Sequence, residues 1–308
     1  MNQNQMNCSQ ILKSNPRKPV SQLPPGATGY LVKSRQQTTN ELADRGVSVV
    51  SGRDWLSRVP ETVAFPDHHN PLEFLKVKDQ RQTGSCAGFA SAQVGEGCFH
   101  LESGEVERFN GWAQYYLAQE KGGLLGRDVG SMPQDNAWAC INVGLVPSSV
   151  CPDPPATYQQ GWRVTTEMRE AAAPFRMKSI VDLDADDIKP FLTKGQGYIT
   201  AASIWPANFD QGGNVITSFY GPRRQDQHGG GHMYSIMGWY NHPQHGWCAL
   251  LVNSWGVQHW GDEGAKLITL RALQEMAQHQ FTVFLGWSDM EQDHNKLRTA
   301  KFDIRDLA

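Results

Sequence analysis

The stretch DQRQTGSCAGFASA, residues 79–92, is decisive for the fold because it places a single cysteine between a turn and a helix. Thr-Gly-Ser at 83–85 favours a turn, and the small residues after Cys86 favour a closely packed helix. A cysteine attacks as its thiolate, and a free thiol has a pKa of about 8.5. The partial positive charge of a helix N-terminus favours that anion. Cys86 is therefore a candidate nucleophile, with a small buried hydrophobe as the alternative.

The chain beyond Cys86 favours helices as far as about residue 150. Apolar and small residues at helical spacing, ended by glycines, predict helices within 86–104, 109–123 and 132–147. One more short helix, with aspartates at its start, is expected within 184–196.

The later part of the chain has the pattern of strands. Short apolar runs rich in β-forming residues and bounded by Gly, Pro, Asn or Asp predict strands at 198–205, 232–240, 247–255 and 265–270. Helices followed by one antiparallel sheet or barrel indicate an α+β fold with two lobes. A cleft between such lobes is a common place for a binding site.

A histidine is needed to take the proton of the thiol. The segment QHGGGHMYSIMGWYN, residues 227–241, offers His228 within a glycine-rich loop and His232 at the start of a strand. His232 is the better candidate because it lies on a rigid element. Taken alone, either histidine is more often structural or solvated.

The following strand contains Asn253 among apolar residues. A buried asparagine must be hydrogen-bonded. Its side-chain oxygen is able to accept from the second imidazole nitrogen of His232 and so to fix the tautomer of the ring. Trp255 would then shield that hydrogen bond from water. The alternative is an asparagine that ends a strand in a turn.

Three blocks together are similar to the signature blocks of papain-like cysteine peptidases. They are VKDQRQTGSCAGFA (77–90), GGGHMYSIMGWYN (229–241) and LVNSWGVQHWGDEG (251–264), and they follow the family's order of Cys, His and Asn. His232 follows Cys86 by 146 residues (232 − 86), within the roughly 130–150 expected for this family. The resemblance implies a papain-like two-lobe fold. The helical lobe would carry the cysteine, and an antiparallel β-barrel lobe would carry the histidine and the asparagine.

The resemblance also implies a cysteine endopeptidase and a role for each residue. Cys86 would be the nucleophile that forms an acyl-enzyme, and His232 the base that later protonates the leaving amine. Asn253 would orient His232, and Trp255 would match the family's shielding tryptophan. Gln80 would donate its amide to the oxyanion beside the backbone N–H of Cys86, and losing one such donor typically costs ~10²–10³ in rate.

Three positions depart from the family's pattern, and none removes a catalytic group. Thr83 stands where the family usually has a disulfide cysteine, Ala87 where it has an aromatic residue, and Gly231 where an acidic residue often precedes the histidine. Gly130 and Met132 are candidate lining residues of the main side-chain pocket, and Gly231 is a third. As core or turn residues, Gly130 and Met132 fit equally well.

The resemblance covers only part of the chain, which suggests three regions. Residues 1–58 read as an N-terminal arm or a pro-region-like segment, with one short helical piece at 38–46, TTNELADRG. Residues 59–288 form the expected catalytic domain, and 289–308 a polar C-terminal tail. Within the domain, the helical lobe is expected at about 75–165 and the β lobe at about 166–288. The arm is expected to pack on the body, in or near the cleft, and to keep the enzyme latent as a zymogen.

Composition excludes several other classes of protein. The net charge of −3 and the pI near 6.4 give no strong field toward nucleic acid or anionic membrane. No apolar run resembles a signal peptide or a membrane span. We therefore expect the cytoplasm, a non-classical route of delivery, or transport within a particle. The partner expected is a protein or peptide substrate.

The cysteines give no sign of a metal or redox site, and we expect no metal or cofactor. None of them forms a CxxC pair. Free thiols are favoured over disulfides, and Cys140 with Cys151 is the first pair to consider for a bridge. The six cysteines are Cys8, Cys86, Cys98, Cys140, Cys151 and Cys248.

Two other functions remain open on the same fold. One is a structural or interaction component of a larger assembly, for example a virion, with the N-terminal arm binding a protein partner. The other is an acyltransferase or amidase, because the same four groups serve any acyl transfer.

Overall fold

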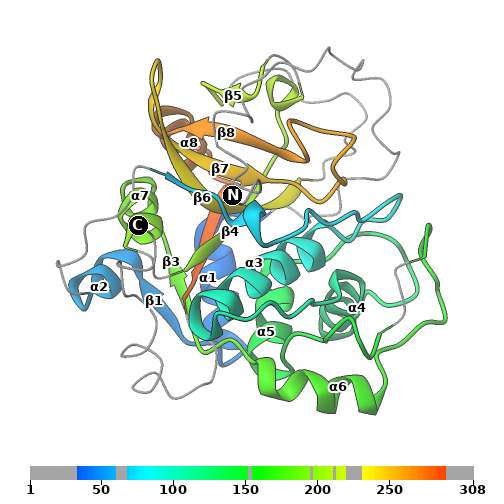
Figure 1. The fold of residues 1–308 in the computed structure, drawn as a ribbon. Helices are drawn as coiled ribbons and strands as arrows, with labels where there is room; N and C mark the ends of the chain where they lie inside the picture. The colour runs from blue at the N-terminus through cyan, green and yellow to red at the C-terminus, as the bar shows by residue number, and fades with distance from the viewer. Residues whose placement is uncertain are drawn as a thin grey trace.

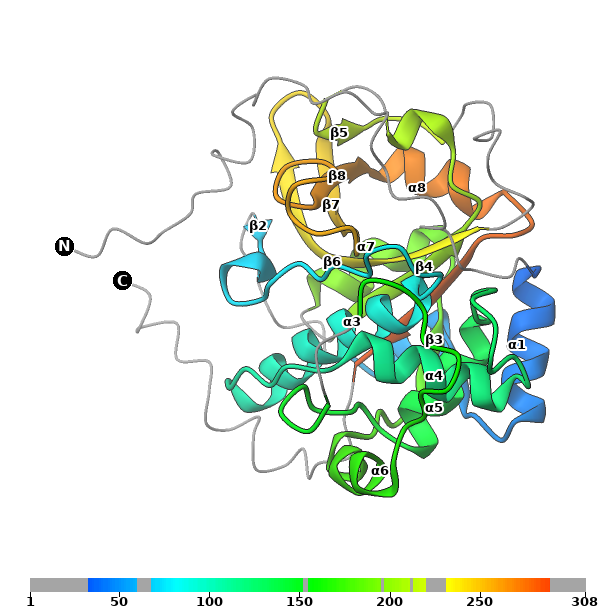
Figure 2. The same ribbon diagram turned by 90° about the vertical axis from the view of Figure 1, so that its right-hand side faces the viewer.

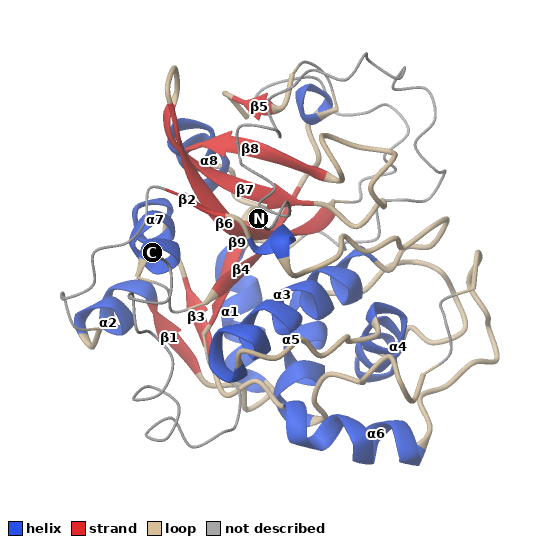
Figure 3. Cartoon of the chain, in the orientation of Figure 1, coloured by secondary structure: helices blue, strands red, loops and turns tan. Residues whose placement is uncertain are grey.

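The fold separates into a mainly helical half and a mainly β half. In the structure, a computed structural model, residues 33–59, 68–151, 155–194, 197–210, 213–219 and 231–288 are described. Most helices lie in the lower half of Figure 1 and most strands in the upper half, and Figure 3 shows the same division by colour. The predicted α+β fold with two lobes is confirmed.

The helical half is built around α3 (Cys86–Ser103), which lies between α4 (Gly111–Lys121) and the sheet. Small residues let its neighbours approach closely. A methyl group at Gly88 would overlap the carbonyl oxygen of Gly111, and one at Gly97 would lie 2.4–2.7 Å from atoms of Tyr198 and Met237. The helix ends at Gly104, whose φ of 72° is the left-handed conformation of a helix C-cap.

The other two helices of this half are α5 (Pro133–Asn142) and α6 (Thr166–Ala172). Pro133 at the first helical position is preset for a helix start. The helices predicted within 86–104, 109–123 and 132–147 are thus present.

The β half is one nine-stranded sheet in the order β1-β3-β9-β4-β6-β7-β8-β5, with β2 paired to β6. Its centre, from β9 through β4, β6 and β7 to β8, is antiparallel, while β1–β3 and β5–β8 pair in parallel. All four predicted strands are present as β4, β6, β7 and β8. The strands are β1 (Val49–Ser51), β2 (His68–His69), β3 (Ile180–Asp182), β4 (Tyr198–Ser203), β5 (Val215–Ile216), β6 (His232–His242), β7 (Gly246–Val252), β8 (Ala265–Thr269) and β9 (Val283–Trp287).

Four further α-helices are described besides α3 to α6. The predicted short helix is α7 (Ala185–Thr193), and α8 (Leu270–Ala277) follows β8 directly. Near the N-terminus, α1 (Arg35–Asp44) and α2 (Gly52–Ser57) flank β1. Ser34 closes a capping box at the start of α1, which fixes where that helix begins.

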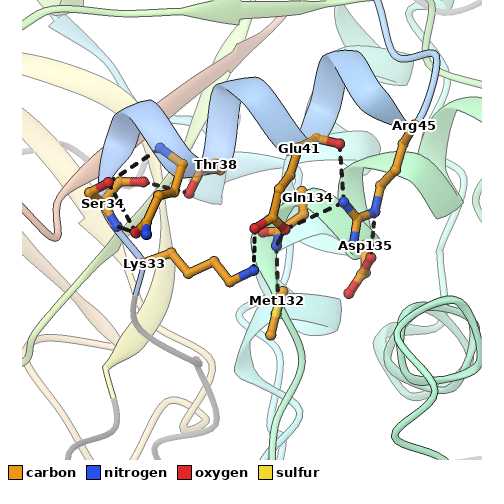
Figure 4. Close-up of polar contacts among 9 residues, drawn as sticks. Lys33, Ser34, Thr38, Glu41, Arg45, Met132, Gln134 and Asp135 are labelled. Carbon is orange, nitrogen blue, oxygen red and sulfur yellow. Dashed lines mark hydrogen bonds and ion pairs between the residues drawn. The ribbon is translucent and has the colours of Figure 1, made fainter.

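The segment assigned to an N-terminal arm contributes to the same fold where it is described, from 33 to 59. Strand β1 extends the sheet beside β3, and α1 packs beside α5 (Figure 2). Figure 4 shows the polar contacts of α1: Arg45 Nε donates to Asp135 Oδ1 at 2.9 Å, and Gln134 Nε2 donates to Glu41 Oε2 at 2.5 Å. Residues 1–32 and the tail at 289–308 lie outside the described residues.

Two features bear on membranes and disulfides. Within the described ranges, no helix has the length and apolar character needed to cross a bilayer. Cys140 and Cys151 are both buried, and neither is part of a disulfide.

Candidate active site

Cys86 is the first residue of α3, at the helix end whose N–H groups have no partner within the helix. Its side chain is buried and not part of a disulfide. It lies in a small cluster with residues of β4 and β6, so the helix start is packed directly on the strands that follow. The cluster consists of Cys86, Ala87, Ala90, Ala202 and Met233.

His232 is the first residue of β6, directly before Met233 of that cluster, and it is opposite Ser203 of β4. Its Nε2 lies 2.7 Å from Oδ1 of Asn253. The backbone N–H of Ser254 also donates to this Oδ1, at 2.7 Å, which identifies the atom as the oxygen of the amide. An oxygen acceptor requires the proton on Nε2, and the neutral ring then holds a lone pair on Nδ1. Nδ1 is the nitrogen that a base would use.

Aromatic rings enclose the His232–Asn253 hydrogen bond. Trp255 lies 4.8 Å from the imidazole at an angle of 33°, and Trp205 meets it edge-on at 4.9 Å. Both indoles are buried. Because a hydrogen bond is stronger where water is excluded, this enclosure stabilises one orientation of the ring. This role of Trp205 was not predicted from the sequence, since the contact joins the segment after β4 to the start of β6.

The segment before Cys86 runs beside the segment after Asn253. The backbone N–H of Gln80 donates to Ser254 O at 2.8 Å, and the N–H of Gly256 donates to Lys78 O at 2.9 Å. The hydroxyl of Ser254 donates to Gln80 Oε1 at 2.6 Å. These bonds join the two halves of the molecule at the site.

Gln80 is held against the turn that precedes Cys86. Its Nε2 donates to the carbonyl oxygen of Thr83 at 2.7 Å, and its side chain is 1% exposed. The hydroxyl of Thr83 donates to Gln80 O at 2.7 Å and also lies 2.6 Å from Ser85 Oγ, in a second hydrogen bond. Hydrogen bonds therefore order the turn where the family usually has a disulfide cysteine. Gln82, by contrast, is exposed.

The three candidate pocket residues occupy different places. Gly130 lies beside the turn, because a Cβ on Gly84 would be 3.2 Å from its backbone nitrogen. Met132 precedes α5, and its Sδ accepts from Gln134 Nε2 at 3.1 Å, on the side that faces α1 (Figure 4). Gly231 is buried directly before His232. His228 lies outside the described residues.

Across the described parts of the chain, no three His, Cys, Asp or Glu side chains gather as a metal site. The donor set is one thiol, one imidazole and two amides, which suits acyl transfer.

Solved structures with a similar fold are cysteine proteases. The chain is similar to xylellain, a cysteine protease from Xylella fastidiosa, at 18% identity and a TM-score of 0.64, covering 87% of this chain and 97% of that chain. It is also similar to procathepsin B S9 from Trypanosoma congolense, at 16% identity and a TM-score of 0.60, covering 85% of this chain and 86% of that chain. A third similar structure is digestive procathepsin L 3 of Tenebrio molitor, at 17% identity and a TM-score of 0.57, covering 85% of this chain and 83% of that chain. No family model matches the chain, and no curated protein matches its sequence. The chain therefore has the papain-like two-lobe fold.

Proposed function

We propose that this protein is a cysteine endopeptidase that cleaves peptide bonds through an acyl-enzyme on Cys86. The observation that carries the proposal is the enclosed His232–Asn253 hydrogen bond, on the strand that packs against the helix that starts with Cys86. An imidazole held in one tautomer, with Nδ1 as its basic atom, is what a thiol nucleophile needs.

Acylation begins when the proton on Sγ of Cys86 passes to Nδ1 of His232. The sulfur attacks the carbonyl carbon of the peptide bond, and the electron pair of the C=O bond moves to the oxygen. The backbone N–H of Cys86 and Nε2 of Gln80 donate to that oxyanion. The C–N bond then breaks, the leaving amine takes the proton from His232, and a thioester remains on Cys86.

Deacylation repeats the sequence with water. His232 takes a proton from the water, the hydroxide attacks the thioester carbon, and the same two donors stabilise the second oxyanion. The C–S bond breaks, the acid product leaves, and the thiolate of Cys86 recovers the proton. Asn253 keeps the imidazole aligned through both half-reactions, because its oxygen holds the Nε2–H throughout.

The test is covalent trapping by an epoxysuccinyl peptide, read by intact mass. We expect one adduct on the wild type and none on Cys86→Ala or His232→Ala. Cys98→Ala is the matched control, since Cys98 is a buried thiol on the same helix, and it should label like the wild type. Because Cys86 is buried, the rate of labelling also reports how readily the residues packed over its side chain move aside. Equal labelling of the wild type and Cys86→Ala would contradict the proposal.

Hydrolysis of an unstructured peptide substrate is measured with the same variants. Cleavage that disappears with Cys86→Ala supports a peptidase. Trapping of Cys86 without cleavage of any peptide, but with acyl transfer to an added amine, would instead favour the acyltransferase alternative.

A further inference from the structure

A set of side chains binds the backbone of residues 126–130, here called the pocket loop. Gln119 Nε2 donates to Arg127 O at 2.8 Å and to Gly130 O at 3.1 Å. The N–H of Gly130 donates to the hydroxyl of Tyr115 at 3.2 Å, and the N–H of Gly126 to that of Tyr158 at 2.9 Å. The three side chains also bond one another, through Gln119 Nε2 to Tyr115 Oη and Tyr158 Oη to Gln119 Oε1, both at 2.8 Å. The conformation of the loop is thus set from outside the loop.

Asp128 connects this network to residues 83–85, here called the nucleophile turn. Its Oδ1 accepts from the hydroxyl of Tyr115 at 2.8 Å and from the backbone N–H of Gly84 at 2.9 Å. Gly84 lies two residues before Cys86. A Cβ on Gly84 would be 3.0 Å from Asp128 Oδ1 and 3.2 Å from Gly130 N, so the turn and the loop are in contact.

We propose that Asp128, fixed by Tyr115, is a positioning residue that tethers the nucleophile turn to the pocket loop. The proposal rests on the proposed function. Thr83 stands where the family usually has a disulfide cysteine, and its hydroxyl bonds to the nearby Gln80 and Ser85. The carboxylate of Asp128 provides the turn with a non-covalent link to a separate loop. Hydrogen bonds to an ionised acceptor are the stronger kind, which suits this task.

The tether acts on the oxyanion donor. The N–H of Gly84 is held by Asp128, and the peptide groups between Gly84 and Cys86 lead directly to the N–H of Cys86. If the nucleophile turn moves, the N–H of Cys86 moves away from the position of the oxyanion. Small misplacements of such a donor lower the rate of the reaction. The same movement changes the distance between the turn and Gly130.

The test compares Asp128→Ala, Asp128→Asn, Tyr115→Phe and the matched control Tyr116→Phe. Tyr116 is the next residue of α4, and its hydroxyl binds Gln159 O at 2.6 Å rather than the pocket loop. We expect Asp128→Ala and Tyr115→Phe to lower kcat on a peptide substrate by about 10- to 100-fold. The double variant should lose little more than Tyr115→Phe alone, because removing the Tyr115 hydroxyl already breaks its bond to Asp128. Asp128→Asn keeps an oxygen acceptor and should rescue most of kcat, and Tyr116→Phe should leave kcat unchanged.

Hydrogen exchange of the Gly84 amide tests the tether without any substrate. We expect exchange at least ~10-fold faster in Asp128→Ala and in Tyr115→Phe than in the wild type, with no change in Tyr116→Phe. Unchanged exchange would overturn the tether whatever the activity is. Faster exchange with an unchanged kcat would overturn its positioning role. If the wild type cleaves no peptide but the variants show the expected pattern of exchange, the proposed function is wrong and the tether is still supported.

Discussion

At the scale of single residues, Lys266 is a buried cation close to the candidate site. It lies in β8 with 4% exposure, its Nζ donates to Phe209 O at 2.8 Å, and it sits 5.1 Å from the ring centre of Trp260. Trp260 in turn packs on Trp205, the ring that meets His232 edge-on. Burial lowers the pKa of Lys266 from 10.5 to about 8, and Asp210 opposes this shift.

This shift predicts how stability depends on pH. Below pH 8 the folded and unfolded chains both hold the proton on Lys266, and the full cost of burying the charge is present. Between pH 8 and 10.5 the folded chain releases the proton first, so the free energy of unfolding rises with pH. Relative to Lys266→Met, the wild type should gain about 1.4 kcal/mol per pH unit in this window.

Urea unfolding at pH 7, 8.5 and 9.5 measures that difference, since the other groups titrate alike in both proteins. Lys121→Met is the control, because Lys121 also lies over a tryptophan, at 4.4 Å from the ring of Trp138, but is exposed. Any change with pH that both variants share is not due to the burial of Lys266. A flat difference for Lys266→Met would contradict the prediction.

The contacts that the sequence allowed us to predict lie within the three sequence blocks. The hydrogen bond expected between His232 and Asn253 is present, and Trp255 lies over it as expected. The contacts of Trp205 and Asp128 were not predicted. Each depends on a partner far away in the chain, and no local spacing indicates such a pairing.

At the scale of elements, the approach of α3 to α4 depends on a glycine. A methyl group at Gly88 would overlap the carbonyl oxygen of Gly111 and lie 2.6 Å from the backbone nitrogen of Tyr115. Because both atoms belong to backbone, neither is able to move aside cheaply. The small residues after Cys86 thus set the spacing of α3 and α4.

Replacing Gly88 by alanine should therefore destabilise the protein by about 1–3 kcal/mol. This is the opposite of the gain of about 1 kcal/mol that alanine gives in an unconstrained helix. Gly161→Ala is the control, because no atom lies within 4 Å of a Cβ there. Urea unfolding of both variants gives the answer, and a Gly88→Ala variant as stable as the wild type would refute this account.

Helices and strands with a clear hydrophobic pattern were predictable from the sequence. Strands that depend on pairing with distant strands were not. The helices α3, α4, α5 and α7 and the central strands match their predicted ranges, apart from shifts at their ends. Strand β9 was not predicted, although it pairs with both β3 and β4.

At the scale of the whole molecule, residues 33–59 connect the two halves. Arg45 binds Asp135 of α5, and Arg35 binds Asp182 of β3 at 2.8 Å. Asp135 is 1% exposed. Burial raises the pKa of its carboxyl, and the charge of Arg45 is the main opposing effect. The ion pair therefore compensates a buried charge that would otherwise destabilise the fold.

Residues 1–58 were expected to form an arm or pro-region-like segment that keeps the enzyme latent, and the contacts of α1 and β1 predict a different outcome of its removal. Arg45→Ala leaves Asp135 buried without its cation and should destabilise the protein by about 3 kcal/mol. Asp135→Asn in that background should restore part of the loss. Arg53→Ala, at an exposed position in the same segment, is the control and should change stability by less than about 0.5 kcal/mol.

Two deletions separate a pro-region from a structural segment. Removing residues 1–32 keeps α1, β1 and Arg45, so unfolding in urea should match that of the full chain. Removing residues 1–58 takes away the edge strand and the partner of Asp135, so this chain should unfold at lower urea or not be recovered folded. Labelling of Cys86 by the epoxysuccinyl peptide is followed in all three. If residues 33–58 are instead a detachable inhibitor, the shorter chain will stay folded and label faster, and the structural role argued for α1 and β1 will be wrong.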